Sequence, residues 1–541
     1  MKKSLFIALA ALGFAACAEK AETNVPVNNG EKEQSYMAVT FTADDITRAD
    51  DGEYAAGTEA ERAVNSAYVF FFKENGEAFY VTDGDTSTNN GPKNYIEVEL
   101  EKEGENMDNV SDVNKSVLVL KNYKGEYPAQ LVAVLNWTPA QNSYTLENLK
   151  TKMTDLGDDT KGYVMCNAAY LDNAGKEKYT TDVRIENIVK RTAGETEDDA
   201  KDRAKATPVV VHVERVAAKV EFAAKQDGKF HVGEVNSTPV YAQITGYELY
   251  NDYEESWLMK RIDPTWTAAI GFNWNDANWY RSYWAKSIAK SFEDNSFSWN
   301  HNTEAEKFNS TVFDGDDTLP LYCCENTREW SEANDVRTKV IVKACLVDAN
   351  DNAVELVNWY GKYYVGEDTV KAVVANTLAN NYYYYSTDGQ NFTGIEGGDI
   401  KCTERNVVDA KAFEVFFQLS DAGEVKTWYE YKDGLYAPIT RDVLNERLAA
   451  VEPALVYNDG MTYYYTDIKH LGAPDTTAEF GVVRNHLYRV NVTDIVGYGT
   501  PVYNGSTGFI TPEKPVDVST YVAAQINILS WRIVEEDYEL N

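Results

Sequence analysis

The C-terminal segment, Val518 to Leu540, constrains the fold more than any other stretch of the chain. Apolar residues alternate along it at Val522, Ala524, Ile526 and Ile528, and this period of two is typical of a β-strand with one buried face. After Ile528 the apolar phase shifts by one residue, which predicts a β-bulge between two strand segments. A long apolar strand at a chain end tends to pair with another chain unless its edge is covered.

This terminal strand has two alternative roles, and its pattern alone does not choose between them. In the first, the strand closes a β-sandwich of its own chain. In the second, it leaves its own chain and completes the sheet of a neighbouring subunit by strand addition. The side chains that would then be buried in the neighbour are Ile526, Ile528, Leu529, Trp531 and Ile533.

Length and composition indicate a folded, β-rich protein with more than one domain. The chain has 541 residues, more than one hydrophobic core usually organises. Aromatic residues make up 13% and charged residues 25% of it, which favours β structure over disorder. The formal net charge of −35 excludes binding to nucleic acid, or to an anionic membrane, through the overall field of the protein.

The N-terminus has the organisation of an export signal. Lys2 and Lys3 precede an apolar stretch, Leu5 to Phe14, that is too short to span a bilayer. Residues 14–17 (Phe-Ala-Ala-Cys) then resemble the lipobox of bacterial lipoproteins, in which the Cys17 thiol would carry the diacylglycerol that anchors the protein to a membrane. An ordinary secretory signal is the alternative, because the first lipobox position holds Phe instead of the more usual Leu.

A short strand and a basic residue follow the signal. After a polar tether, Met37, Val39 and Phe41 alternate with small or polar residues, which predicts a short amphipathic strand. Arg48 and Ala49 come directly after it, among Thr, Ala, Asp and Gly residues. Such a segment offers the extended backbone and the basic side chain that a trypsin-like protease requires.

We predict a first β domain over residues 49–222. An Asn-Gly pair ending at Gly76 marks a hairpin turn between its first two strands. A helix is predicted to begin after Thr145, a suitable N-cap, since apolar residues then recur at helical spacing. A charged, loop-rich segment, 160–202, precedes a long strand pair that closes the domain over Thr207 to Phe222. The helical apolar positions are Leu146, Leu149, Met153 and Leu156.

The second β domain is predicted over residues 223–541, ending in the terminal strand 518–540. It begins at a Gly-, Lys- and Asn-rich break and contains a short helix over Arg441 to Val451. Between Trp266 and Trp284 the sequence is unusually aromatic. Such a cluster is most often a loop packed on the core, and in the alternative it stacks on sugars.

The sequence contains no pattern typical of an enzyme. Its five histidines are scattered, and no nucleophile-elbow, zinc-protease, phosphate-loop or dinucleotide-binding motif occurs. We therefore expect no catalytic residue, no cofactor and no metal site. The five cysteines after Cys17 match no disulfide framework and are expected to be mostly buried thiols, although a bridge from Cys323 or Cys324 to Cys345 is conceivable.

Several motifs, in the order in which they occur, resemble those of the fimbrillins, the type V pilin family of Bacteroidetes, and most of all the shaft subunit of short fimbriae. The strongest are Arg484-Asn485-His486-Leu487-Tyr488-Arg489-Val490-Asn491-Val492, Ile495 to Pro501, and Ile528-Leu529-Ser530-Trp531. The supporting ones are Val213-Glu214-Arg215-Val216-Ala217-Ala218-Lys219-Val220, the Tyr68 to Gly76 hairpin, Leu135-Asn136-Trp137, and Cys324-Glu325-Asn326-Thr327.

The resemblance implies a mainly β protein with two transthyretin-like β-sandwich domains and a few short helices. It also implies export as an outer-membrane lipoprotein and removal of the N-terminal segment by an arginine-specific protease. The family's cleavage site carries over to Arg48-Ala49. Arg62 is a second candidate, but it lies in a segment predicted to be ordered. Until cleavage, the strand with Met37, Val39 and Phe41 would fill a slot in the first domain, and afterwards the C-terminal strand of another subunit would replace it.

The expected protein is thus a structural subunit of an adhesive fimbria on the cell surface. Its expected partners are other copies of itself, accessory fimbrial subunits, the protease, a host or bacterial surface receptor, and the outer membrane through the lipid before cleavage. Two alternatives remain: an anchor or tip subunit of the same fimbria, or a surface glycan-binding lipoprotein that uses the aromatic cluster.

Overall fold

The structure of the protein is a computed structural model. It describes residues 34–42, 57–82, 91–98, 116–121, 126–171, 176–224, 228–250, 252–262, 285–287, 299–300, 319–327, 337–380, 383–404, 414–470, 479–503, 521–530 and 533–534.

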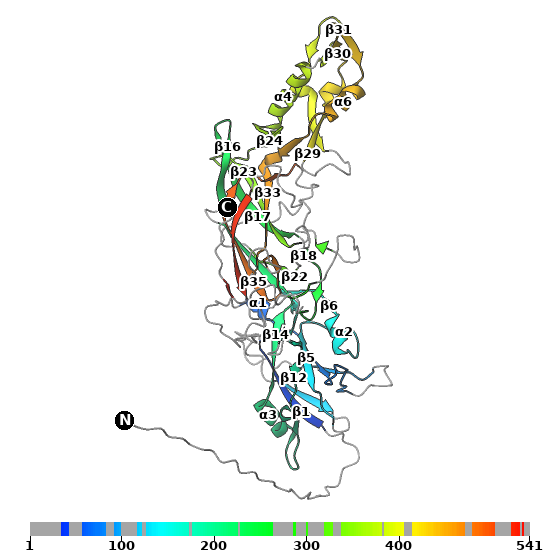
Figure 1. Cartoon of the computed structure of the whole chain (residues 1–541), viewed down its shortest axis with the longest axis vertical. Helices are drawn as coiled ribbons and strands as arrows, with labels where there is room; N and C mark the ends of the chain where they lie inside the picture. Colours follow the sequence, from blue (N-terminus) through cyan, green and yellow to red (C-terminus); the bar gives the residue numbers. More distant parts are fainter. Residues whose placement is uncertain are drawn as a thin grey trace, which may run out of the picture.

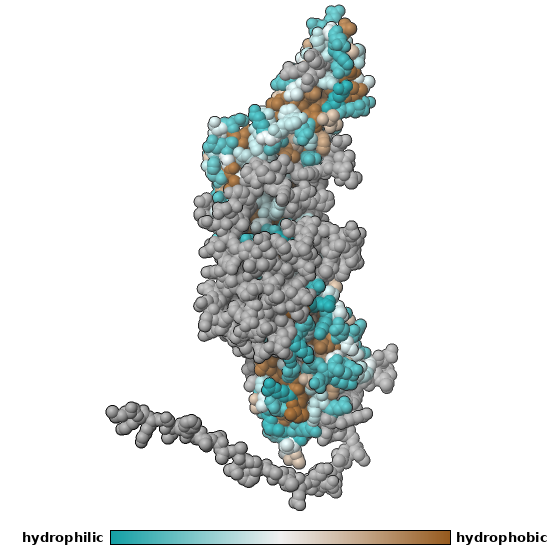
Figure 2. All heavy atoms as spheres, viewed as in Figure 1, coloured by the Kyte–Doolittle hydropathy of each residue, from teal (hydrophilic) through white to brown (hydrophobic). Residues whose placement is uncertain are grey.

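Strands dominate the described residues, as predicted, and the described helices are short (Figure 1). Figure 1 shows three groups of strands that follow one another along the long axis of the molecule. The lower group carries β1, β5 and β14, the middle group β17, β23 and β35, and the upper group β29 to β31 with α4 and α6. On the face shown in Figure 2, hydrophobic and hydrophilic residues are interspersed at both ends.

The lower group is a nine-stranded sheet. Hydrogen-bonded pairing connects β13-β1-β14-β9-β5-β2-β3, and β4 also pairs with β1 and β12 with β5. The bounds are β1 (Gln34–Thr42), β2 (Ala67–Phe72), β3 (Tyr95–Glu97), β4 (Ser116–Lys121), β5 (Gln130–Leu135), β9 (Met165–Asn167), β12 (Thr181–Asp182), β13 (Val189–Lys190) and β14 (Val209–Arg215).

The middle group consists of two five-stranded sheets whose buried side chains form one hydrophobic core. The first sheet contains β21 (Leu321–Cys323), β15 (Ala218–Ala224), β35 (His486–Val496), β37 (Tyr521–Ser530) and β38 (Ile533–Val534). The second contains β16 (Lys229–Val235), β17 (Thr238–Tyr250), β23 (Lys339–Val347), β33 (Met461–Asp467) and β36 (Thr500–Pro501).

The upper group has a hydrophobic core of its own, which our sequence analysis did not predict. It lies in the sequence between β23 and β33, which pair with each other, so it is an insertion into the middle group. It contains β24 (Leu356–Trp359), β25 (Lys362–Val365), β28 (Ile400–Glu404), β29 (Glu414–Leu419) and β32 (Ala454–Tyr457) in one sheet, and β26 (Tyr383–Tyr385), β27 (Thr393–Gly394), β30 (Trp428–Lys432) and β31 (Leu435–Ile439) in another.

Helices and short strand pairs complete the described elements. The α-helices are α1 (Glu59–Arg62), α2 (Leu146–Lys150), α3 (Glu197–Ala206), α4 (Glu367–Asn380), α5 (Asp421–Glu424) and α6 (Arg441–Ala449), and the 3-10 turns are Ile185–Asn187, Gly397–Asp399 and Asn458–Gly460. The strand pairs are β6 (Met153–Thr154) with β19 (Ser256–Trp257), β7 (Gly157–Asp158) with β8 (Gly162–Tyr163), β10 (Tyr170–Leu171) with β11 (Glu177–Lys178), β18 (Asp252–Tyr253) with β20 (Trp299–Asn300), and β22 (Asn326–Thr327) with β34 (Gly481–Val482).

The structure corrects three local predictions. The helix after Thr145 begins where expected, and Thr145 is its N-cap, but it ends at Lys150 because Met153 and Thr154 pair with β19 as strand β6. The segment 160–202, which we predicted to be loop-rich, contains most of α3. The strands predicted as a pair over Thr207 to Phe222 are present, but β14 and β15 belong to different sheets.

Three of the sequence motifs meet at the junction between the lower and middle groups. The Arg484 guanidinium is completely buried and forms an ion pair with Glu325 at 3.3 Å. The Lys260 ammonium forms a second buried ion pair with Glu214, at 3.0 Å. The Asn485 side chain accepts a hydrogen bond from the backbone amide of Arg215 at 3.3 Å. The Asn485 contact links the lower group directly to the segment before β35. Truncating one member of either buried ion pair would leave an uncompensated charge at this junction.

Two findings complete the description of the fold. All five cysteines after Cys17 are free thiols, so the conceivable bridge to Cys345 is not formed. No helix in the described part of the chain is both long and apolar enough to cross a membrane.

The first prediction concerns a buried carboxyl group at this junction. Burial raises the pKa of Asp252 to about 8, although the backbone amide of Cys324 donates a hydrogen bond to it at 2.9 Å. In the unfolded chain its pKa is about 3.9. The stability contributed by the protonated native carboxyl is therefore complete below pH 4 and is lost as the pH rises toward about 8.

We expect wild type to lose stability relative to Asp252→Asn as the pH rises from about 5 to about 8, measured by thermal unfolding. Asp348→Asn is the control. Hydrogen bonds from Asn352 lower the pKa of the half-buried Asp348, so its substitution should leave the pH dependence of stability in this range unchanged. A difference between wild type and Asp252→Asn that is the same at every pH would contradict the assignment.

Candidate assembly site

Strand β1 lies in the interior of the lower sheet and pairs along both of its edges. On one edge it runs antiparallel to β4, from Gln34 opposite Lys121 to Val39 opposite Ser116. On the other edge it pairs with β13 near its start and runs parallel to β14 from Val39 to Thr42. A segment close to the N-terminus therefore occupies a central slot between strands that come from much later in the sequence.

One face of β1 supplies large apolar side chains to the core. Met37, Val39 and Phe41 are all completely buried, as the predicted alternation requires. They pack in one cluster with side chains from β2, β4, β5 and β14, among them Val69, Phe71, Leu118, Leu120, Leu131, Ala133, Val209 and Val211.

The opposite face of β1 is also buried, which differs from the amphipathic strand that we predicted. Tyr36 and Ala38 on this face are at most 1% exposed. Helix α3 covers them with Ala200 and Ala204, which lie on one face of the helix because they are four residues apart. Small side chains on the helix let it approach the strand closely.

The sequence of α3 explains both its formation and why it was missed. Thr196 caps its N-terminus in a reciprocal arrangement with Asp199, and Lys201 pairs with Glu197 at 2.8 Å. Acidic residues fill its first turn and basic residues its last, which suits the helix dipole. The two buried alanines were the signal available in this otherwise charged stretch.

Removing β1 would leave the lower sheet open. Strand β4 pairs with β1 alone among the described strands, and Val209 to His212 of β14 would lose their partner on that edge. Unpaired backbone groups and the apolar lining would then face water, which is unfavourable for both. Each large side chain of β1 contributes roughly 1.5–3 kcal/mol through burial, so an empty slot would bind another apolar strand strongly.

The predicted processing residues fall mainly outside the described part of the chain. Cys17, Arg48 and Ala49 all lie there. The second cleavage candidate, Arg62, is the last residue of helix α1, and the side chain of the preceding Glu61 is completely buried. The backbone at Arg62 is therefore helical, whereas proteases bind extended segments.

The C-terminal strand is part of the sheet of its own chain in this structure. β37 runs antiparallel to β35, from Tyr521 opposite Val496 to Ser530 opposite His486. The backbone of the predicted donor residues Ile526, Ile528 and Leu529 lies in β37 and that of Ile533 in β38, whereas Trp531 lies outside the described residues.

The predicted bulge after Ile528 is wrong. β38 folds back along β37, with Leu529 opposite Ile533 and Ile528 opposite Val534, so the apolar phase shifts at a chain reversal. The register irregularity lies in the partner strand, between Val492 and Asp494 of β35. The short returning strand covers part of the outer edge of β37, which limits unwanted pairing.

Comparison with known proteins identifies the C-terminal region. Residues 455–537 match the family model described as "Major fimbrial subunit protein type IV, Fimbrillin, C-terminal". This segment contains β33, β35, β37 and β38, and therefore the terminal strand and the strand that holds it. A comparison with curated protein sequences gave no match.

Solved structures of fimbrial proteins show only distant similarity. A fimbrillin from Porphyromonas gingivalis W83 is 12% identical, with 91% of this chain and 96% of that chain covered and a TM-score of 0.35. The tip fimbrial protein Mfa3 from Porphyromonas gingivalis, solved with a C-terminal truncation, is 11% identical, with 91% and 99% covered and a TM-score of 0.27. Similarity at this level does not establish a shared function, and the family match itself is confined to residues 455–537.

The second prediction tests whether β1 is an integral part of the precursor's core. Phe41→Ala should destabilise the uncut protein by about 3–5 kcal/mol, the usual cost of truncating a buried aromatic side chain. The measurement is denaturant unfolding of the full chain. Thr40→Ala is the matched control on the half-buried neighbouring position. A change below 1 kcal/mol for Phe41→Ala would show that β1 does not pack as described.

Proposed function

We propose that this chain is a fimbrillin and a structural subunit of an adhesive cell-surface fimbria, and that its β1 is a removable blocking strand. The match of residues 455–537 to the C-terminal fimbrillin model supports the family assignment. The observation that supports the proposed function most directly is the position of β1. A strand that precedes the predicted Arg48-Ala49 cleavage site fills the middle of a sheet, with both edges paired and both faces buried. A strand in this position can be cut from the chain and then exchanged for another.

Cleavage after Arg48 makes this exchange favourable, but the cut alone does not remove β1 from its slot. Before the cut, β1 is tethered to its slot and has a high effective concentration there. After the cut, it is held only by backbone pairing and by the burial of Tyr36, Met37, Val39 and Phe41. Because these contacts are strong, β1 would dissociate from the slot only slowly by itself. The incoming strand would therefore displace β1 progressively along the slot.

The donor that we propose is the C-terminal strand of another copy. Its sequence Tyr-Val-Ala-Ala-Gln-Ile, 521–526, repeats the pattern of Tyr-Met-Ala-Val-Thr-Phe, 36–41, position by position. In this register Tyr521 replaces Tyr36, and Val522 and Ile526 replace Met37 and Phe41. Ala523 takes the place of Ala38, the position that α3 covers closely.

The pairing of β37 with β35 gives the donor strand a place before assembly. An unpaired apolar strand would aggregate, so storage on the subunit's own sheet protects it until a partner's slot opens. Strand exchange then trades one set of β pairings for another. In the neighbour's slot the strand would be buried on both faces, as β1 is before cleavage.

The remaining features of the proposal follow the sequence analysis. Cys17 carries the lipid that holds the precursor at the outer membrane, and an arginine-specific protease cuts between Arg48 and Ala49. The mature chain then forms a domain over residues 49–222 and a second over 223–541 with the donor strand 518–540. Its partners are further copies, accessory subunits and a surface receptor, and its place is the shaft, with the anchor and the tip as alternatives.

The third prediction concerns the cleavage site. Arg48→Ala should leave full-length monomer that keeps β1 in its slot and does not polymerise after protease treatment. N-terminal sequencing and gel filtration measure the two effects. Arg62→Ala is the matched control and should be cut and assemble like wild type, because Arg62 ends a helix. If Arg48→Ala forms polymers whose subunits begin after Arg62, cleavage occurs after Arg62 and the assignment of Arg48 is wrong.

The fourth prediction concerns the donor strand. Deleting Val518 to Asn541 should abolish polymerisation of the cleaved protein while the lower group, including the β1 slot, stays folded. Because β37 pairs with β35 in the monomer, we expect some loss of stability in the middle group, but no collapse, since β35 keeps β15 on its other edge. The measurement is thermal unfolding of the truncated monomer beside an assay for SDS-resistant oligomers.

A single substitution in β37 tests strand exchange without deleting the strand from the subunit's own sheet. Ala523→Trp should block polymerisation, because the proposed register places this position beneath α3, where a large side chain has no room. Gln525→Ala, two residues further along, is the matched control and should polymerise normally. Normal polymers of Ala523→Trp would overturn the register, and normal polymers of the truncated chain would overturn the donor assignment.

A further inference from the structure

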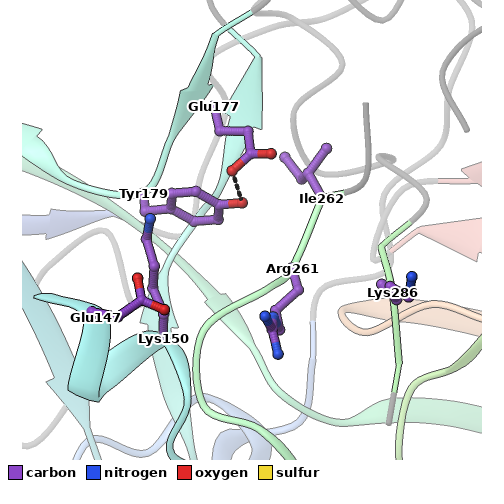
Figure 3. A pocket seen from close by; sticks show the side chains of 7 residues that line it. All are labelled: Glu147, Lys150, Glu177, Tyr179, Arg261, Ile262 and Lys286. Atoms are coloured by element: carbon purple, nitrogen blue, oxygen red, sulfur yellow. Dashed lines mark hydrogen bonds between the residues drawn. The ribbon is translucent and has the colours of Figure 1, made fainter. Parts of the chain in front are cut away.

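A polar recess lies where the lower and middle groups of strands meet, away from the β1 slot. It has a volume of about 420 Å³ and is lined by Glu147, Lys150, Glu177, Tyr179, Arg261, Ile262 and Lys286. Figure 3 shows Glu147, Lys150 and Tyr179 on one side of the recess, with Arg261, Ile262 and Lys286 on the other. The lining comes from four separate segments, so only the tertiary fold creates this recess.

The fold holds the two sides of the recess in fixed positions. Pairing of β6 with β19 brings the segment that ends at Ile262 beside α2. Ile262 is buried in the core below the recess, and it forms an isolated bridge with Ala285. The backbone amide of Lys286 donates to the carbonyl of Arg261 at 2.6 Å. The cationic side chains therefore project from anchored backbone.

Aromatic rings support two of these cations. The Lys150 ammonium lies 4.2 Å from the centre of the Tyr179 ring, and the Arg261 guanidinium lies 4.7 Å from the centre of the Trp257 ring. Cation–π contacts of this kind hold a charged group in place without neutralising it. The Tyr179 hydroxyl donates to Glu177, so one of the two carboxylates of the lining is already engaged (Figure 3). Burial, followed by this hydrogen bond, raises the pKa of Tyr179, so the hydroxyl remains a donor at neutral pH.

The charge of the recess is opposite in sign to that of the protein. Three basic side chains face two acidic ones here, although the chain has 86 acidic and 51 basic residues. Across the described part of the chain, neither Lys150 nor Arg261 has a carboxylate within ion-pair distance. Two half-buried cations that lack an acidic partner in so acidic a protein are suited to binding an external anion.

We propose that this recess binds an acidic saccharide through its carboxylate. Arg261 offers planar, paired N–H donors that match a carboxylate, and Lys150 adds a second positive charge from the opposite wall. The remaining groups suit a polyhydroxylated ring, because six of the seven lining side chains are polar and Ile262 offers a single apolar contact. The volume is within the usual range for small-ligand pockets and accommodates one or two sugar rings.

This site extends the proposed function and does not depend on it. The recess is complete in a single chain and contains no residue of β1 or β37, so binding requires neither cleavage nor polymerisation. A failure of strand exchange and a failure of sugar binding are therefore separate results, and both can be recorded on the same monomeric preparation.

The fifth prediction is tested by calorimetric titration of the full-length monomer. The probes are glucuronic acid and N-acetylneuraminic acid, with glucose and galactose as neutral counterparts. We expect the acidic sugars to bind, with an affinity that falls as salt is added. Lys150→Met and Arg261→Met should each weaken this binding by about tenfold or more, the usual loss for a charge-assisted hydrogen bond. Thermal unfolding of each variant verifies that it is folded.

Lys161→Met is the matched control, because Lys161 is exposed and already pairs with Asp158 at 3.2 Å. It should bind acidic sugars like wild type. Four results would overturn the proposal: no saturable binding of either acidic sugar, equal binding of the neutral sugars, undiminished binding by both folded recess variants, or binding of a glutamate dipeptide or inorganic phosphate in place of the sugars. The last result would assign the recess to a different anion.

Discussion

The pairing of β1 along both edges is the interaction on which the lower part of this protein depends. Nine residues from near the N-terminus join β4 to β14, and their side chains fill the sheet's core on one face and the contact with α3 on the other. A strand in such a position normally belongs permanently to its domain. Here it lies between a predicted lipid anchor and a predicted cleavage site, although it is buried on both faces.

The chain itself connects this sheet to the separate sheet that holds the terminal strand. β14 pairs with β1, the next strand β15 pairs with β35, and β35 pairs with β37. Two buried ion pairs lie along this connection. Glu214 of β14 pairs with Lys260. Arg484, which lies just before β35, pairs with Glu325. The position of β1 and the terminal strand are thus linked by consecutive strand pairings and by one stretch of chain from β14 to β15.

The motifs that indicated the family have a structural role in this chain. Glu214, Glu325 and Arg484 belong to three sequence motifs that are far apart in the chain, and they converge at the junction between two groups of strands. They mark the contact between the two groups, and the family match at residues 455–537 includes Arg484 but neither Glu214 nor Glu325. The sugar-binding recess that we propose lies at the same junction but uses different residues.

The sequence by itself determined the mainly β fold, the buried face of β1 with Met37, Val39 and Phe41, the start of α2 at Thr145, and the strand character of residues 521–530. Each of these depends on local periodicity or capping, which short segments encode. Tertiary structure decided what lies against each element. It buried the second face of β1 under α3, separated β14 from β15, reversed the chain after β37, inserted the upper group, and assembled the polar recess. None of these five features is encoded locally, because each depends on which distant segment packs against the element. The hydrophobic spacing within one segment does not specify its distant partner.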